Sequence, residues 1–178
     1  MKIFEQRLHT SKRYAVALVI AGCAFLIASC GVYSFKDVSI DYTKIKTIKV
    51  GFIENRARYI NPQLSPQLTT RLQQKITSTT KLTSTANDEA NLVVNGAITD
   101  YSVTTAAITT QQSLTNRLTV TVHMVVKDNV NNKTDEFDAT RNFDFSANLS
   151  LDQAQAQLQE DILKNVTDEI FNHIFSNW

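Results

Sequence analysis

Four consecutive residues near the N-terminus have the types and the order that a lipid-attachment reaction requires. Ile27, Ala28, Ser29 and Cys30 are an aliphatic residue, two small residues and a cysteine, the pattern called a lipobox. Only a thiol can accept the diacylglycerol, and small side chains let the scissile backbone enter a signal peptidase. We therefore expect Cys30 to carry a diacylglycerol and an N-acyl lipid as the first residue of the mature protein. The alternative is that Cys30 is not lipidated and is only a small apolar residue near an ordinary signal-peptide cleavage site.

The segment before Cys30 has the layout of a secretory signal. Four basic residues precede an apolar run of 15 residues from Tyr14 to Ala28, whereas a membrane-spanning helix needs roughly 20. Residues 1–29 are therefore predicted to be a removed lipoprotein signal peptide. Cys23 leaves with this segment, so the mature chain is expected to lack an internal disulfide.

The remaining sequence offers no set of residues for catalysis or metal binding. After the signal, the only histidines are His123 and His173, far apart in sequence, while a zinc site needs three or four clustered ligands. The chain has only four glycines and no phosphate loop, dinucleotide fingerprint or nucleophile elbow. We expect no enzymatic activity, no metal and no cofactor besides the lipid on Cys30.

Positive charge is local rather than global. Residues 30–178 hold 14 Lys+Arg against 16 Asp+Glu, a net charge of −2, which disfavours nucleic acid as a partner. The candidates for contacting an anionic glycolipid are Arg56 and Arg58, after the first expected strand, and Lys127 and Lys133, beside an expected hairpin turn. Such side chains can donate charge-assisted hydrogen bonds to phosphates. Ordinary solvated loop charges are the alternative.

Residues 30–44 are interpreted as a lipidated N-terminal tether or short edge strand, followed by a strand over 45–53. In that strand Ile48, Val50 and Phe52 share one face, which is expected to be buried. Ser65 and Pro66 are predicted to cap and begin a helix. The apolar stripe of this helix is Leu68, Leu72 and Ile76.

Three longer strands are expected next, over 91–104, 115–127 and 134–145. The first should bend or bulge near Gly96 or Asp100, because its apolar parity changes there. The second alternates cleanly between aliphatic and polar residues. An Asp- and Asn-rich turn over 128–132 then predicts an antiparallel hairpin with the third.

The last element is a long amphipathic helix. Ser150 and Gln153 form a capping box that predicts a helix reaching about Ser176. Its apolar residues recur every three or four positions, which favours packing on a sheet; a partner-binding helix is the alternative. The stripe comprises Leu151, Ala154, Leu158, Ile162, Val166, Ile170 and Ile174.

This order of elements predicts an α+β fold for a single domain over residues 45–178. The expected architecture is a two-layer sandwich with two helices on one face of a four-stranded, mostly antiparallel sheet. The other face, rich in Thr, Lys and Asp, is available for water or a partner.

Several segments resemble the LptE-like lipopolysaccharide-assembly lipoproteins of Gram-negative bacteria. They are the opening Cys-Gly-Val-Tyr-Ser-Phe of 30–35, the strand Ile-Lys-Val-Gly-Phe of 48–52, the Leu-Val-Val-Asn-Gly of 92–96, and the terminal helix. The resemblance covers nearly the whole mature chain and lies mainly in the order of elements.

The resemblance implies a lipid-anchored protein on the periplasmic side of the outer membrane. It implies that this protein plugs the β-barrel translocon LptD, supports its assembly and engages lipopolysaccharide. No family motif aligns with the basic residues, so Arg56, Arg58, Lys127 and Lys133 stand on charge and position alone. The competing hypothesis is a free-standing envelope lipoprotein that binds a ligand without a barrel partner.

Overall fold

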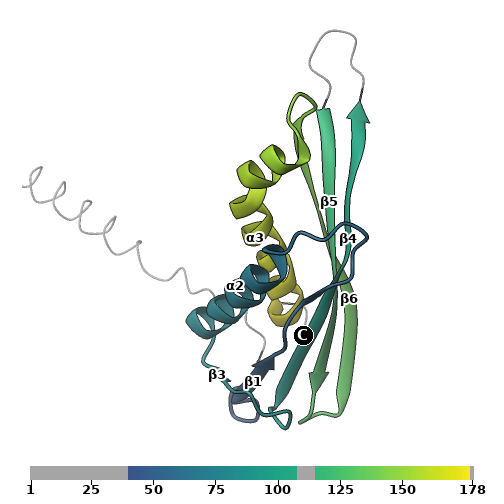
Figure 1. Ribbon diagram of the computed structural model, residues 1–178. Helices are drawn as coiled ribbons and strands as arrows, with labels where there is room; N and C mark the ends of the chain where they lie inside the picture. The colour runs from purple at the N-terminus through teal and green to yellow at the C-terminus, as the bar shows by residue number, and fades with distance from the viewer. Residues whose placement is uncertain (1–39, 108–114, 177–178) are drawn as a thin grey trace, which may run out of the picture. The chain divides into compact units, whose positions relative to one another are not determined.

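The computed structural model describes residues 40–107 and 115–176 (Figure 1). Residues 1–39, including the predicted signal peptide, Cys30 and most of the tether, lie outside the described residues. The elements are β1 Thr47–Val50, β2 Glu54–Asn55, α2 Leu64–Thr79, β3 Thr83–Ser84, β4 Leu92–Ala107, β5 Thr115–Asp128, β6 Lys133–Ser146 and α3 Leu151–Ser176. The fold is therefore α+β, as predicted.

The sheet is larger and more mixed than the four-stranded, mostly antiparallel sheet predicted from sequence. It has six strands in the order β3-β1-β4-β5-β6, with β2 beside β4. The long strands β4, β5 and β6 are antiparallel neighbours, whereas β1 runs parallel to both β3 and β4. The parallel pairs follow from the chain path, because α2 lies between β1 and the next strands and returns the chain to the same end of the sheet.

The strand expected over 45–53 is broken in the middle. Val50 pairs with Val94 and Glu54 pairs with Ala97, so three residues of the edge lie opposite two residues of β4. This extra residue acts as a bulge and reverses the side-chain alternation. Phe52 is consequently 59% exposed, whereas Ile53 is fully buried. The prediction that Phe52 shares the buried face was wrong.

The start of α2 also differs from the prediction. The helix begins at Leu64 with Gln63 as its N-cap, so Ser65 is a buried residue inside the helix and not its cap. The Asn61 side chain instead accepts a hydrogen bond from Gln63 N at 3.0 Å. Pro66 fits the first turn because N–H groups there have no intrahelical acceptor.

Three other local predictions were confirmed. The β5–β6 hairpin pairs Lys127 with Thr134 in antiparallel register, and β4 has a register shift between Ile98 and Asp100. The capping box forms in both directions: Ser150 N donates to Gln153 Oε1 at 3.0 Å, and Gln153 N donates to Ser150 Oγ at 3.3 Å.

Both helices cover the same face of the sheet (Figure 1). The long helix α3 packs on β5 and β6, the shorter α2 packs on β1 and β3, and the two helices pack on each other. The predicted stripe of α2 is buried throughout, and that of α3 is buried from Ala154 onward. In the part of the chain described, neither helix combines the length and apolarity needed to cross a bilayer.

Candidate functional site

The four basic candidates lie at two separate places on the sheet. The Arg56 N–H donates to the Ile98 carbonyl at 2.9 Å, which places Arg56 beside the middle of β4. Lys127 instead pairs with Val93, near the start of β4. Five residues of extended strand separate these positions, a distance of about 17 Å. The structure therefore does not bring the two basic pairs into one cluster.

The charges of these four residues are engaged to different degrees. Arg56 Nε donates to Glu54 Oε2 at 2.9 Å, so its charge is locally balanced. Lys133 lies opposite Asp128 across the hairpin turn and also has an interaction partner. Arg58 and Lys127 are exposed and make no ion pair with the described residues. These two cations are the ones whose charge remains available to an anionic ligand.

The sheet face opposite the helices carries a row of hydrogen-bonded side chains from β5 and β6. We call the four cross-strand pairs the polar ladder. Arg117 donates to both oxygens of the Asp144 carboxylate, at 2.7 and 3.0 Å. The other pairs are Thr119 with Asn142 at 2.8 Å, Thr121 with Thr140 at 3.1 Å, and His123 Nδ1 with Asp138 at 2.8 Å.

Each side chain of the polar ladder is hydrogen-bonded to its cross-strand partner. The hydrogen bond from Arg117 holds the pKa of Asp144 below its usual range, and Asp144 raises the pKa of Arg117. The sequence predicted a polar face here, because the outward positions of both strands hold Thr, Asp and Asn. This face can contact another polar surface through side chains without exposing an apolar strip.

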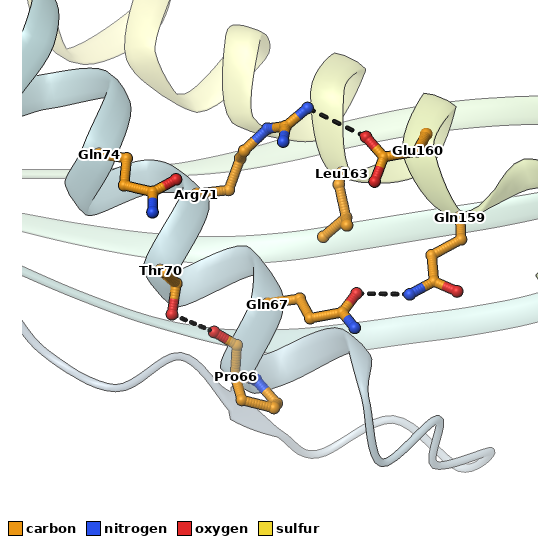
Figure 2. A pocket seen from close by; sticks show the side chains of 8 residues that line it. All are labelled: Pro66, Gln67, Thr70, Arg71, Gln74, Gln159, Glu160 and Leu163. Atoms are coloured by element: carbon orange, nitrogen blue, oxygen red, sulfur yellow. Dashed lines mark hydrogen bonds and ion pairs between the residues drawn. The ribbon is translucent and has the colours of Figure 1, made fainter.

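A groove runs over the outside of the helix layer, between α2 and α3. Its central hollow is open to solvent, has a volume of about 360 Å³ and is shown in Figure 2. Two contacts link the helices there: Gln159 Nε2 donates to Gln67 Oε1 at 2.6 Å, and Arg71 lies 3.1 Å from Glu160 Oε2. The lining comprises Pro66, Gln67, Thr70, Arg71, Gln74, Gln159, Glu160 and Leu163.

The groove continues into further hollows on either side. One of about 250 Å³ lies toward the start of α3 and shares Gln159 with the central hollow. Another of about 470 Å³ lies toward the end of α2 and shares Arg71 and Gln74. In the latter, Lys75 pairs with Asp168 at 2.6 Å. Sequence reasoning missed this groove, although the repeated glutamines of both helices were a visible signal.

A buried tyrosine contacts two residues of the 250 Å³ hollow. The Tyr101 side chain approaches Asn61 and Gln155, which both line the hollow. Burial is the main reason that the pKa of Tyr101 is raised, and hydrogen bonding to the Asn61 and Gln155 side chains opposes the shift. The Tyr101 Oη and Gln155 Nε2 atoms are shielded from solvent. The hydroxyl of Tyr101 therefore belongs to the packing between β4, α3 and the loop before α2.

The described residues contain no group of three His, Cys, Asp or Glu side chains placed to hold a metal. His123 pairs with Asp138 on the polar ladder, whereas His173 on α3 lies 3.3 Å from Asp135 and stacks on Phe137. The two histidines therefore belong to opposite faces of the sheet, and each has a structural partner.

Several solved structures have a similar backbone but low sequence identity to this protein. A hypothetical protein, CT253 from Chlamydia trachomatis, has a TM-score of 0.48 and 9% identity, covering 73% of this chain and 98% of its own. A PelC dodecamer from Paraburkholderia phytofirmans has a TM-score of 0.46 and 12% identity, covering 71% and 86%. A putative neuraminyllactose-binding hemagglutinin homolog from Helicobacter pylori has a TM-score of 0.49 and 10% identity, covering 80% and 87%.

The family comparison is more informative. No curated protein matches the sequence. The model of the family LptE, described as lipopolysaccharide-assembly, matches residues 45–174, which is nearly three quarters of the chain and runs from just before β1 into the last turn of α3. The chain belongs to the LptE family of lipopolysaccharide-assembly proteins.

Proposed function

We propose that this protein is a non-enzymatic subunit of the lipopolysaccharide assembly machinery that plugs an LptD-type β-barrel in the outer membrane. The observation that carries the proposal is the family match, which covers the sheet and both helices rather than one motif. The proposal places the protein on the periplasmic side of the membrane, in contact with lipopolysaccharide as it passes.

The polar ladder supports a position inside a barrel. The lumen of a membrane β-barrel is lined by polar side chains, and its closed wall offers no free strand edge. A plug must therefore contact the wall through side chains on a polar surface. The ladder from Arg117–Asp144 to His123–Asp138 is such a surface, and its side chains are hydrogen-bonded across the two strands.

Two features suit the lipid environment. The proposed diacylglycerol and N-acyl chain on Cys30 would anchor the protein stably, because more than one chain is needed for lasting membrane attachment. The exposed cations Arg58 and Lys127 can donate charge-assisted hydrogen bonds to lipopolysaccharide phosphates.

Affinity purification from mild detergent tests the barrel partnership. A tagged full-length chain is expected to recover a large β-barrel protein. Thr140→Arg adds bulk and charge to the polar ladder and should abolish that recovery, whereas Thr77→Arg, on the exposed face of α2, should not. If no barrel is recovered by the unaltered chain, the plug function is wrong and a free-standing binding module remains. Palmitate labelling of wild type and Cys30→Ala tests the anchor separately.

A further inference from the structure

Beyond Ile98, the strand β4 is an open edge of the sheet. β1 and β2 pair with β4 only as far as Ile98, where the Arg56 N–H donates to the Ile98 carbonyl at 2.9 Å. From Thr99 to Ala107, β4 pairs with β5 alone in the part of the chain that the structure describes (Figure 1). Alternate residues of this stretch direct their backbone N–H and C=O groups away from β5. Such an edge can pair with a further strand.

Two other edges of the sheet are protected. Six of the 14 residues of β6 are charged, and charged side chains on an edge strand deter pairing. At the break between β1 and β2, side chains of α2 bond to the backbone: Gln73 donates to the Val50 carbonyl at 3.2 Å, and Thr69 accepts from the Ile53 N–H at 3.0 Å. The open stretch of β4, in contrast, has a single charged residue, Asp100.

Exposed apolar side chains gather beside the open edge of β4. Val103, within that edge, is 38% exposed. Tyr59 stacks on Tyr101 of the same strand with ring centroids 5.7 Å apart and is 39% exposed, and its neighbour Ile60 is 59% exposed. These are three of the four exposed large hydrophobic residues in the described chain; the fourth is Phe52. Exposed apolar residues that gather in one place are typical of an interaction surface, whereas scattered ones are ordinary.

We propose that the open edge of β4 pairs with the same edge of a second copy of this chain. The two strands run antiparallel about a two-fold axis at Val103, so that the sheets of both copies become continuous. A two-fold interface requires a surface that matches itself, and here the residues placed opposite one another are compatible. They are Val103 with Val103, Ser102 with Thr104, and Tyr101 with Thr105.

The charge and the size of this contact indicate what kind of dimer forms. No charged residue lies between Tyr101 and Thr105, so the pairing brings no like charges together across the axis. A contact of about five residues from each copy is smaller than a standard stable interface, so the dimer is reversible.

The dimer is separate from the barrel proposal, because it uses β4 and not the polar ladder of β5 and β6. Val103→Lys should prevent the dimer and leave recovery of the barrel unchanged. Thr140→Arg, which should abolish recovery of the barrel, should leave the dimer intact. Failure of one proposal therefore leaves the other standing.

Single cysteines in the full-length chain test the contact in its own membrane. Residues directly opposite each other in antiparallel strands are close enough for a disulfide. After oxidation, most of the Val103→Cys chain should run at twice the monomer mass on a non-reducing gel. Thr134→Cys, at an exposed position of β6, should stay monomeric, as should the unaltered chain. The proposal is overturned if Val103→Cys gives no dimer, if it links only to a different protein, or if both variants link equally.

A mixed pair of cysteine variants tests the register. Two differently tagged copies carry Ser102→Cys and Thr104→Cys, and the mixed disulfide should exceed either homodimer, because these positions lie opposite each other. Adding Val103→Lys to both copies should remove the mixed disulfide, since like charges directly opposite are destabilising, whereas adding Thr134→Lys should not. Val103 is already 38% exposed, so an unchanged Tm is expected for Val103→Lys. Survival of the mixed disulfide in the presence of Val103→Lys would show that the two copies meet elsewhere.

Discussion

The hydroxyl of Thr69 on α2 accepts a hydrogen bond from the backbone N–H of Ile53 at 3.0 Å and donates one to the Ser65 carbonyl at 2.8 Å. Both Thr69 and Ile53 are buried. Ile53 lies in the break between β1 and β2, where β4 no longer pairs with the edge. The Thr69 hydroxyl on α2 therefore supplies the hydrogen-bond acceptor for Ile53 N–H that the interrupted strand lacks. This hydrogen bond fixes Ile53, and not Phe52, as the residue that points into the core.

Thr69→Val should destabilise the fold by about 1–3 kcal/mol, because it keeps the side-chain shape but leaves the buried Ile53 N–H unpaired. Urea unfolding measures the change. Thr70→Val is the matched control, since Thr70 makes the same kind of bond to the Pro66 carbonyl but is exposed; its effect should stay within about 0.5 kcal/mol. Equal losses in the two variants would contradict this role for Thr69.

A second prediction concerns the close packing of Gly96 against Met124. A Cβ on Gly96 would lie 2.4 Å from Met124 Sδ and 3.0 Å from the His123 carbonyl oxygen. Because Met124 is fully buried, Gly96→Ala overpacks the core and should cost about 1–3 kcal/mol.

The double variant with Met124→Ala tests that explanation. Met124→Ala alone should cost about 2–5 kcal/mol through the cavity it leaves. The double variant should cost clearly less than the sum of the singles, since the added methyl then fills vacated space. Strict additivity in thermal or urea unfolding would show that the two residues do not compete for this volume.

Elements with strong local signals were predictable from sequence. The capping box at Ser150 and Gln153 closes within four residues, and the β5–β6 hairpin needs only alternation and a turn. Phe52 was misplaced because alternation assumes an unbroken strand, whereas the break depends on Thr69, 16 residues further along the chain. A short extended piece over 81–85 was predictable and contains β3, but its parallel pairing with β1 was not, since that pairing exists only after α2 has crossed over.

The candidate site was less predictable than the fold. Arg56 and Lys127 were both candidates because they are basic and lie beside expected loops, but the distance between them depends on which residues of β4 they lie beside. The burial of Tyr101 beside Asn61 and Gln155 is likewise a product of three segments meeting. A sequence shows which side chains carry charges or amides. Which of these side chains come into contact depends on the register of the strands and on the packing of α2 against α3.

The Arg117–Asp144 pair predicts a pH dependence of stability. The hydrogen bond from Arg117 lowers the pKa of Asp144 from its ordinary value of 3.8, so the pair stabilises the fold above that value. The contribution is lost as the pH falls through the lower, folded-state pKa. The difference in Tm between wild type and Asp144→Asn should therefore be largest above pH ~5 and disappear in stronger acid.

The control for this effect is Asp161→Asn, on the exposed face of α3. Asp161 makes no ion pair in the described part of the chain, so its replacement should show no such dependence on pH. The Asp144 effect should also shrink in high salt, because the pair is solvent-exposed and screened. A Tm difference for Asp144→Asn that persists unchanged into strong acid would show that packing, not charge, is responsible.

The last prediction concerns Arg58 and Lys127, the two basic candidates that make no ion pair with the described residues. Arg58→Glu and Lys127→Glu should each weaken lipopolysaccharide binding roughly two- to fivefold in low salt, the range expected for one exposed charge contact. Arg58 follows Arg56, which lies beside Ile98, whereas Lys127 pairs with Val93, so the two positions are separate and their effects should be additive in free energy. Lys46→Glu reverses the same charge at another exposed position near β1 and should have little effect. The measurement is the binding of each full-length variant to purified lipopolysaccharide in low and in high salt. If all three variants weaken binding equally, the net charge of the protein, and not the positions of Arg58 and Lys127, governs lipopolysaccharide binding.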